Sequence, residues 1–84
     1  MEIRIQAIHF DVTERLDAFI RKKVAKLSQY HDGILDAEVI LRVVKPETAR
    51  NKQAGIRLQI KSNDCFAEKV SDTFEEAVDE AVVA

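Results

Sequence analysis

The sequence predicts an α+β domain with the element order βαβββα. Three segments place apolar residues at every second position, which is the repeat of a half-buried strand: 2–10, 37–44 and 56–61. A fourth strand is expected at 65–70, because Ser62-Asn63-Asp64 supplies turn residues before it. Two segments place apolar residues three and four positions apart, which is the repeat of an amphipathic helix: 13–30 and 73–84. In this order, two helices pack on one face of a four-stranded sheet and leave the other face partly open.

The first strand and first helix follow from local chemistry. Ile3 and Ile5 alternate with charged neighbours, so one side of the strand faces a core. Asp11 or Thr13 offers a side-chain oxygen to the free N–H groups at the start of the helix. Asp32-Gly33 ends the helix near Tyr30, because glycine readily adopts the left-handed conformation that closes helices.

Turn residues separate the remaining elements. The second strand stops at Lys45-Pro46, since proline cannot donate to a sheet, and the stretch Pro46–Gln53 is expected to form an exposed hairpin loop. Thr73 and Glu76 have the spacing of a capping box for the second helix. The final residues provide no glycine cap and no cation, so we expect this helix to continue beyond Ala84.

Composition limits the protein to one small domain, residues 1–84. The chain is 46% hydrophobic and 33% charged, which is a globular balance. Charges interrupt the N-terminal apolar residues, so we expect neither a signal peptide nor a membrane partner, and a cytoplasmic location. The single cysteine, Cys65, excludes an internal disulfide.

No motif for catalysis is present. The sequence has no Gly-rich phosphate loop, no HExxH and no paired cysteines, and its histidines, His9 and His31, lie at the ends of different elements. Four carboxylates in the last helix fall near its N-terminus, where they favour the helix dipole without any metal: Glu75, Glu76, Asp79 and Glu80. We therefore expect no enzyme activity, no catalytic residue, no cofactor and no metal.

Charge is unevenly distributed along the chain. Residues 1–61 carry 12 Lys and Arg against 8 Asp and Glu, a balance of +4. Residues 62–84 carry Lys69 against 7 Asp and Glu, a balance of −6, which makes the total −2. A surface that binds a polyanion is therefore expected on the first three quarters of the chain.

The candidate RNA-binding surface lies on the first helix. Arg15, Lys22 and Lys26 fall within about 40° of one another at 100° per residue, and so form a basic ridge. Lys23 lies nearer the apolar side and would have to extend toward the ridge. We expect this surface to be widened by cations at and after the end of the second strand: Lys45, Arg50 and Lys52.

From the first helix onward, the order αβββα resembles the double-stranded RNA-binding domain, with an extra N-terminal strand. The whole chain also resembles the ribosome hibernation promoting factors, or ribosome-associated translation inhibitors, in their short form. Five segments carry this resemblance by their order and spacing: Ile3-Arg4-Ile5, Val12-Thr13-Glu14, Lys23 to Tyr30, Val39-Ile40-Leu41 and Ala77-Val78-Asp79. The chain departs from that family's pattern in Glu75, which stands where an aromatic residue is usual, and in lacking the basic continuation of the last helix.

The resemblance implies a ribosome-binding inhibitor that occupies the decoding region of the small subunit. There it would block messenger and transfer RNA in idle cells, binding ribosomal RNA as a monomer, with no DNA partner. Lys23 and Lys26 match basic positions in the first helix of that family. Two alternatives stay open: a general double-stranded RNA-binding module, and a protein-interaction module that uses the open sheet face or the acidic last helix.

Overall fold

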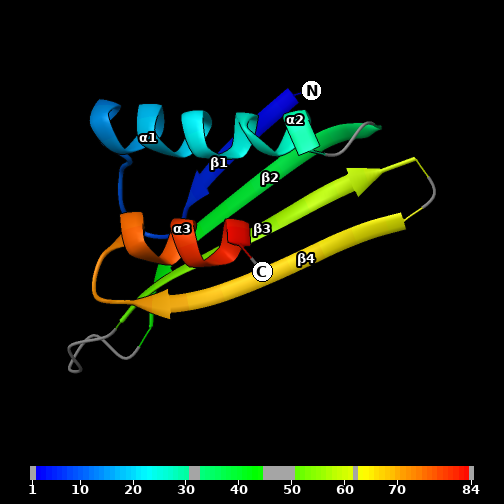
Figure 1. Cartoon of the computed structure of the whole chain (residues 1–84). Coiled ribbons are helices and arrows are strands. Elements are labelled where there is room, and N and C mark those ends of the chain that lie inside the picture. The colour runs from blue at the N-terminus through cyan, green and yellow to red at the C-terminus, as the bar shows by residue number, and fades with distance from the viewer. Residues whose placement is uncertain (1, 31–32, 45–50, 62, 84) are drawn as a thin grey trace.

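A computed structural model of the chain describes residues 2–30, 33–44, 51–61 and 63–83. Its elements follow the predicted order, with one short additional helix (Figure 1): β1 (Glu2–Ala7), α1 (Glu14–Ala25), α2 (Leu27–Tyr30), β2 (Ile34–Val43), β3 (Lys52–Ile60), β4 (Asn63–Ser71) and α3 (Phe74–Val83). The predicted α+β class is confirmed.

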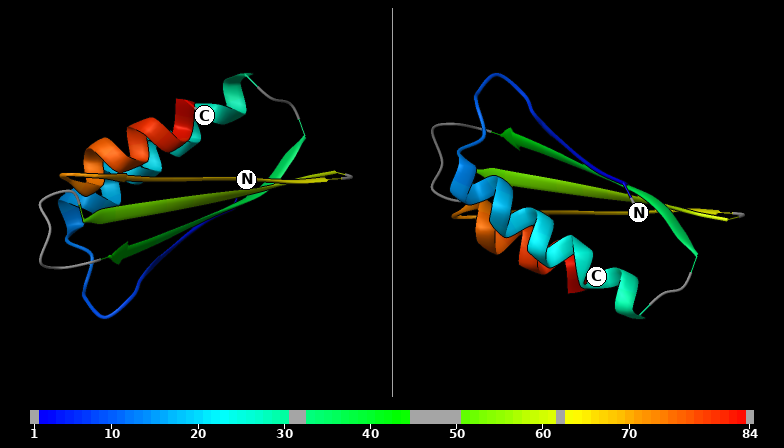
Figure 2. Two further views of the ribbon diagram at one scale, coloured as in Figure 1. Left: turned by 90° about the horizontal axis from the view of Figure 1, so that it is seen from below. Right: turned by 90° about the horizontal axis from the view of Figure 1, so that it is seen from above.

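The sheet has the strand order β1-β2-β3-β4. β1 is parallel to β2, while β3 and β4 form antiparallel ladders. Register places the buried positions of β2 (Ala37, Val39 and Leu41) opposite the apolar positions of β1 (Ile3, Ile5 and Ala7). Because side chains alternate along a strand, these residues share one face of the sheet. The helices cover that face alone, as Figure 2 shows.

The core lies between this face and the helices. α1 contributes Leu16, Ile20 and Val24 to this core, and α3 contributes Ala77, Val78 and Ala81. Among the described residues, the apolar ones with no exposed surface are Ile20, Val24, Ala37, Val39, Leu41, Ala54, Ala77 and Val78. α1 and α3 lie side by side over the sheet, so side chains of one helix can contact side chains of the other (Figure 1).

Threonine caps both longer helices. Thr13, and not Asp11, is the N-cap of α1, where its Oγ1 accepts a hydrogen bond of 3.1 Å from the Leu16 backbone N–H. Thr73 Oγ1 likewise accepts from the Glu76 N–H at 3.1 Å. The Glu76 carboxylate does not return to Thr73, as a full capping box would require. It accepts from the hydroxyl of the fully buried Ser71 at 2.8 Å.

Element ends differ from the sequence prediction in several places. β1 ends at Ala7 rather than Phe10, since His9 adopts a left-handed conformation with φ of 67°. The first predicted helix is divided at Lys26, whose carbonyl accepts from the Gln29 N–H in a tighter, 3₁₀-type turn. β3 begins at Lys52, inside the predicted loop 46–53, and β2 and β4 are also longer than predicted.

The start of β2 contains one extra residue. Ile34 pairs with Ile60 and Asp36 pairs with Gln59, so Leu35 has no partner in the ladder and bulges toward solvent. Its side chain is 53% exposed.

Candidate nucleic-acid interface

Three cations of the predicted ridge are exposed to solvent. Arg15 and Lys22 lie on α1, and Lys26 is its C-cap residue. No described residue forms an ion pair or hydrogen bond with any of these three side chains. Because their charges are not neutralised by neighbours, they are free to contact an external anion.

Arg21, the neighbour of Lys22, has a structural role. Its Nε donates to Asp17 Oδ2 at 2.9 Å, and its Nη1 donates to the Ile3 carbonyl at 3.1 Å. The contact with Ile3 links α1 to the beginning of β1, and the pair with Asp17 within α1 holds the guanidinium in position, so Arg21 does not add to the ridge.

Lys23 turns toward α3 instead of toward the ridge. Its Nζ lies 3.1 Å from Asp79 Oδ1 and 5.5 Å from the centre of the Phe19 ring, and its side chain is 31% exposed. The ring and the carboxylate both stabilise the ammonium, the ring through its negative face. The structure thus corrects the expectation that Lys23 would extend past the core edge to join Lys22 and Lys26.

Lys52, the described cation of the hairpin between β2 and β3, lies elsewhere. Lys52 is half-buried at the start of β3, and its Nζ donates to Asn51 Oδ1 at 2.6 Å. β3 begins at the end of the sheet where α1 also begins, whereas Lys22 and Lys26 lie at the far end of α1 (Figure 1). The structure therefore does not bring Lys52 together with those two lysines. Lys45 and Arg50 lie outside the described residues.

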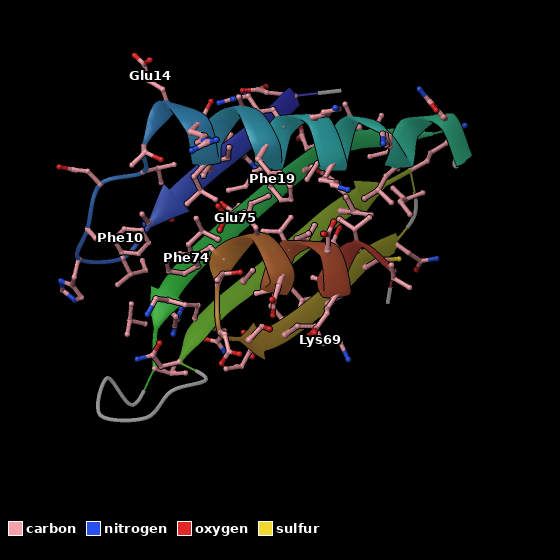
Figure 3. The ribbon with its side chains drawn as sticks, turned by 60° about the vertical axis from the view of Figure 1, so that its left-hand side comes forward. Phe10, Glu14, Phe19, Lys69, Phe74 and Glu75 are labelled. Carbon is pink, nitrogen blue, oxygen red and sulfur yellow. The ribbon has the colours of Figure 1, made fainter. Side chains whose placement is uncertain are left out.

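The neighbouring helix α3 is acidic. Asp79 pairs with Lys23, and Glu75, one turn earlier, lies on the side of α3 that faces α1 (Figure 3). Phe74 stacks on Phe10 with ring centres 5.0 Å apart and planes 18° apart, which fixes the start of α3 against the segment after β1. The helix layer consequently combines free cations on α1 with carboxylates on the side of α3 that faces α1.

Residues that could support other chemistry do not gather. In the ranges 2–30, 33–44, 51–61 and 63–83, no three His, Cys, Asp or Glu side chains are placed to hold a metal ion. Cys65 is exposed in β4, His9 is exposed in the segment after β1, and His31 is not among the described residues. None of the described helices is long and apolar enough to cross a membrane.

A row of free cations along one helix of a small α+β domain is typical of proteins that bind RNA through its phosphates. The family described as Sigma 54 modulation protein / S30EA ribosomal protein matches residues 3–84, and the chain belongs to this family, which includes the hibernation promoting factors. It is therefore a ribosome-associated regulator of translation and not an enzyme.

Two solved structures share the fold of this chain. A ribosomal subunit interface protein from Coxiella burnetii superposes with a TM-score of 0.86 at 19% identity, over 99% of this chain and 87% of that one. The N-terminal domain of Protein Y from Thermus thermophilus superposes with a TM-score of 0.84 at 25% identity, over 99% and 89% of the two chains. No curated protein sequence matches significantly.

Proposed function

We propose that this protein binds the small ribosomal subunit as a monomer at the decoding region, and blocks messenger and transfer RNA there when cells are idle. The observation that supports this proposal is the row of unpaired cations on α1: Arg15, Lys22 and Lys26. Membership of a ribosome-associated family supports ribosomal RNA in the cytoplasm as the polyanion that this row would contact.

The proposed mechanism is positional and steric. Lysine and arginine contacts to phosphate oxygens fix the position of a protein without reading sequence. A rigid domain held in this way inhibits by occupying space, so it needs no reacting group. Each phosphate contact releases counterions, and binding is therefore expected to weaken steeply as salt increases.

Lys23 is proposed as a conditional anchor. Its ammonium already has a carboxylate partner in Asp79, and an exposed pair of this kind is worth only about 0.2–1 kcal/mol. A phosphate brought close by Lys22 and Lys26 can compete for it at modest cost. Lys45 and Lys52 are proposed as peripheral contacts. Lys52 begins β3, far from the end of α1 that carries Lys22 and Lys26.

The test is co-sedimentation with separated ribosomal subunits across a salt series. The double variant Lys22→Glu, Lys26→Glu should lose salt-sensitive binding to the small subunit by about tenfold or more, since two favourable phosphate contacts become repulsive. Lys23 is left unchanged because a glutamate there would repel Asp79 and disturb the contact between the helices.

The matched control carries the same charge change away from α1, at the exposed residues Lys61 and Lys69. It should bind subunits almost like the unmodified chain. Equal binding by the Lys22, Lys26 variant and the control would refute the proposed interface. A plain RNA duplex measured beside the subunits separates the two RNA-binding functions, because a general double-stranded RNA binder would bind both equally well.

A further inference from the structure

The face of the sheet that turns away from the helices is uncovered by any described element (Figure 2). Strand register aligns Arg4, Glu38, Arg57 and Phe66 in one row across all four strands. The next row contains Glu2, Asp36, Gln59 and Asp64. Because side chains alternate along a strand, both rows lie on this outer face.

The outer face contains a shallow polar hollow of about 180 Å³, well below the volume of an ordinary small-molecule pocket. Six residues line it: Arg4, Asp36, Glu38, Arg57, Gln59 and Asp64. None of their side chains forms an ion pair or hydrogen bond with another described residue. Asp36 and Glu38 are half-buried, so they give up part of their hydration without gaining a cationic partner.

An exposed aromatic ring lies on the same face. Phe66 is 55% exposed, in register with Arg57, and its ring leans over Gly55. A Cβ at residue 55 would lie only 3.2 Å from the ring, so glycine lets the ring lie flat on the sheet. A flat, exposed aromatic ring beside unpaired charges is the kind of anchor found at the centre of protein interfaces.

The charge of this face favours one kind of partner. Its described residues include three arginines (Arg4, Arg42 and Arg57) and five carboxylates (Glu2, Asp36, Glu38, Asp64 and Glu68), a balance of −2. That balance repels an RNA backbone, and it also repels the same face of a second copy. A cationic protein segment is attracted to it.

We propose that the outer sheet face is a docking surface for an extended, arginine- or lysine-rich protein segment that also carries an apolar side chain. The cationic side chain enters the hollow and pairs with Asp36, Glu38 and Asp64, while the apolar side chain covers Phe66. The proposal goes beyond the RNA contact through α1 and does not depend on it. The domain would then bind an RNA with one layer and a basic protein with the other.

The experiment measures fluorescence anisotropy of a short labelled peptide in which arginine alternates with leucine. The outer-face variant Asp36→Asn, Glu38→Gln, Asp64→Asn should bind this peptide about tenfold more weakly. The matched control Glu14→Gln, Glu75→Gln, Glu80→Gln removes the same charge from exposed positions on the helices, and should bind within about twofold of the unmodified chain.

The aromatic anchor has its own pair of variants. Phe66→Ala should weaken peptide binding, whereas Leu35→Ala, which removes a side chain of similar exposure, should not. Amide chemical shifts in a ¹⁵N-labelled chain provide a second measurement that needs no variant. The peptide should shift amides of β2, β3 and β4 more than those of α1.

Four results would overturn the proposal. The first two are an equal loss of peptide binding in the outer-face and helix variants, and amide shifts on adding the peptide that are confined to α1 or α3. The other two are a single-stranded RNA that shifts the amides of the outer face, and a dimer in sedimentation that Phe66→Ala abolishes. Binding of ribosomal subunits is measured separately on the same variants. Loss of peptide binding with retained subunit binding distinguishes this surface from the α1 interface.

Discussion

Three consecutive cations of α1 have three different environments. Arg21 holds β1, Lys22 is free in solvent and Lys23 pairs with Asp79 across the helix layer. Successive side chains on a helix point about 100° apart, so a run of like charges is divided among different neighbours. For this reason only Lys22 of the three contributes a permanently available charge to the ridge.

At the residue scale, Asp79→Asn should strengthen binding to the small subunit by about two- to fivefold. The change releases Lys23 from a pair worth about 0.2–1 kcal/mol, so the ammonium becomes available to phosphate. Co-sedimentation at fixed salt measures the effect. Glu80→Gln is the control, since it removes an equal charge from the adjacent residue, and an equal gain there would show that Lys23 is not involved.

At the scale of the element, both longer helices begin at a threonine that follows an extended segment. Thr13 and Thr73 each accept a backbone N–H three residues later, which satisfies one of the free donors of the first turn. α3 has a second link in the bond from Ser71 to Glu76, and a third in the stacking of Phe74 on Phe10. The start of α3 is consequently fixed to the sheet and to the segment after β1.

Thr73→Ala should lower the free energy of unfolding by about 1 kcal/mol, because the Glu76 N–H loses its acceptor. Thr73→Ser keeps the hydroxyl and should remain close to the unmodified chain. Urea unfolding followed by circular dichroism measures both variants. A Thr73→Ala variant as stable as Thr73→Ser would contradict the assigned cap.

For the whole molecule, a single core between the sheet and the helices supports both the ridge on α1 and the outer face of the sheet. Leu41 is fully buried in β2, between β1 and β3, and beneath the helices. Small domains of this size are marginally stable, with total unfolding free energies of about 5–15 kcal/mol. A cavity in this core therefore affects every surface of the protein together.

Leu41→Ala should lower the free energy of unfolding by about 2–5 kcal/mol, since the cavity lies where neighbouring strands cannot readily close it. Thermal unfolding measures this loss. The charge variants of the ridge and of the outer face should unfold near the temperature of the unmodified chain. A ridge variant that unfolded as early as Leu41→Ala would mean that its lost binding reflects lost structure.

Local patterns were sufficient for the elements, because apolar repeats and turn residues act over a few neighbours. They predicted the order βαβββα and the cap at Thr73, and left Asp11 or Thr13 as the cap of α1, of which the structure uses Thr13. They did not predict the division of the first helix at Lys26, since neither glycine nor proline marks it. The early end of β1 depends on a left-handed His9, a conformation that residue type alone does not require.

The sequence by itself determined the fold class, the family resemblance and the basic character of α1, since these depend on residue order and helical spacing. Only the tertiary structure decided which cations stay free, because ion pairs such as Lys23 with Asp79 join residues far apart in the chain. It also separated Lys52 from Lys22 and Lys26, and aligned the outer-face charges of four strands. Such placements depend on register and on packing between elements, which no local pattern contains.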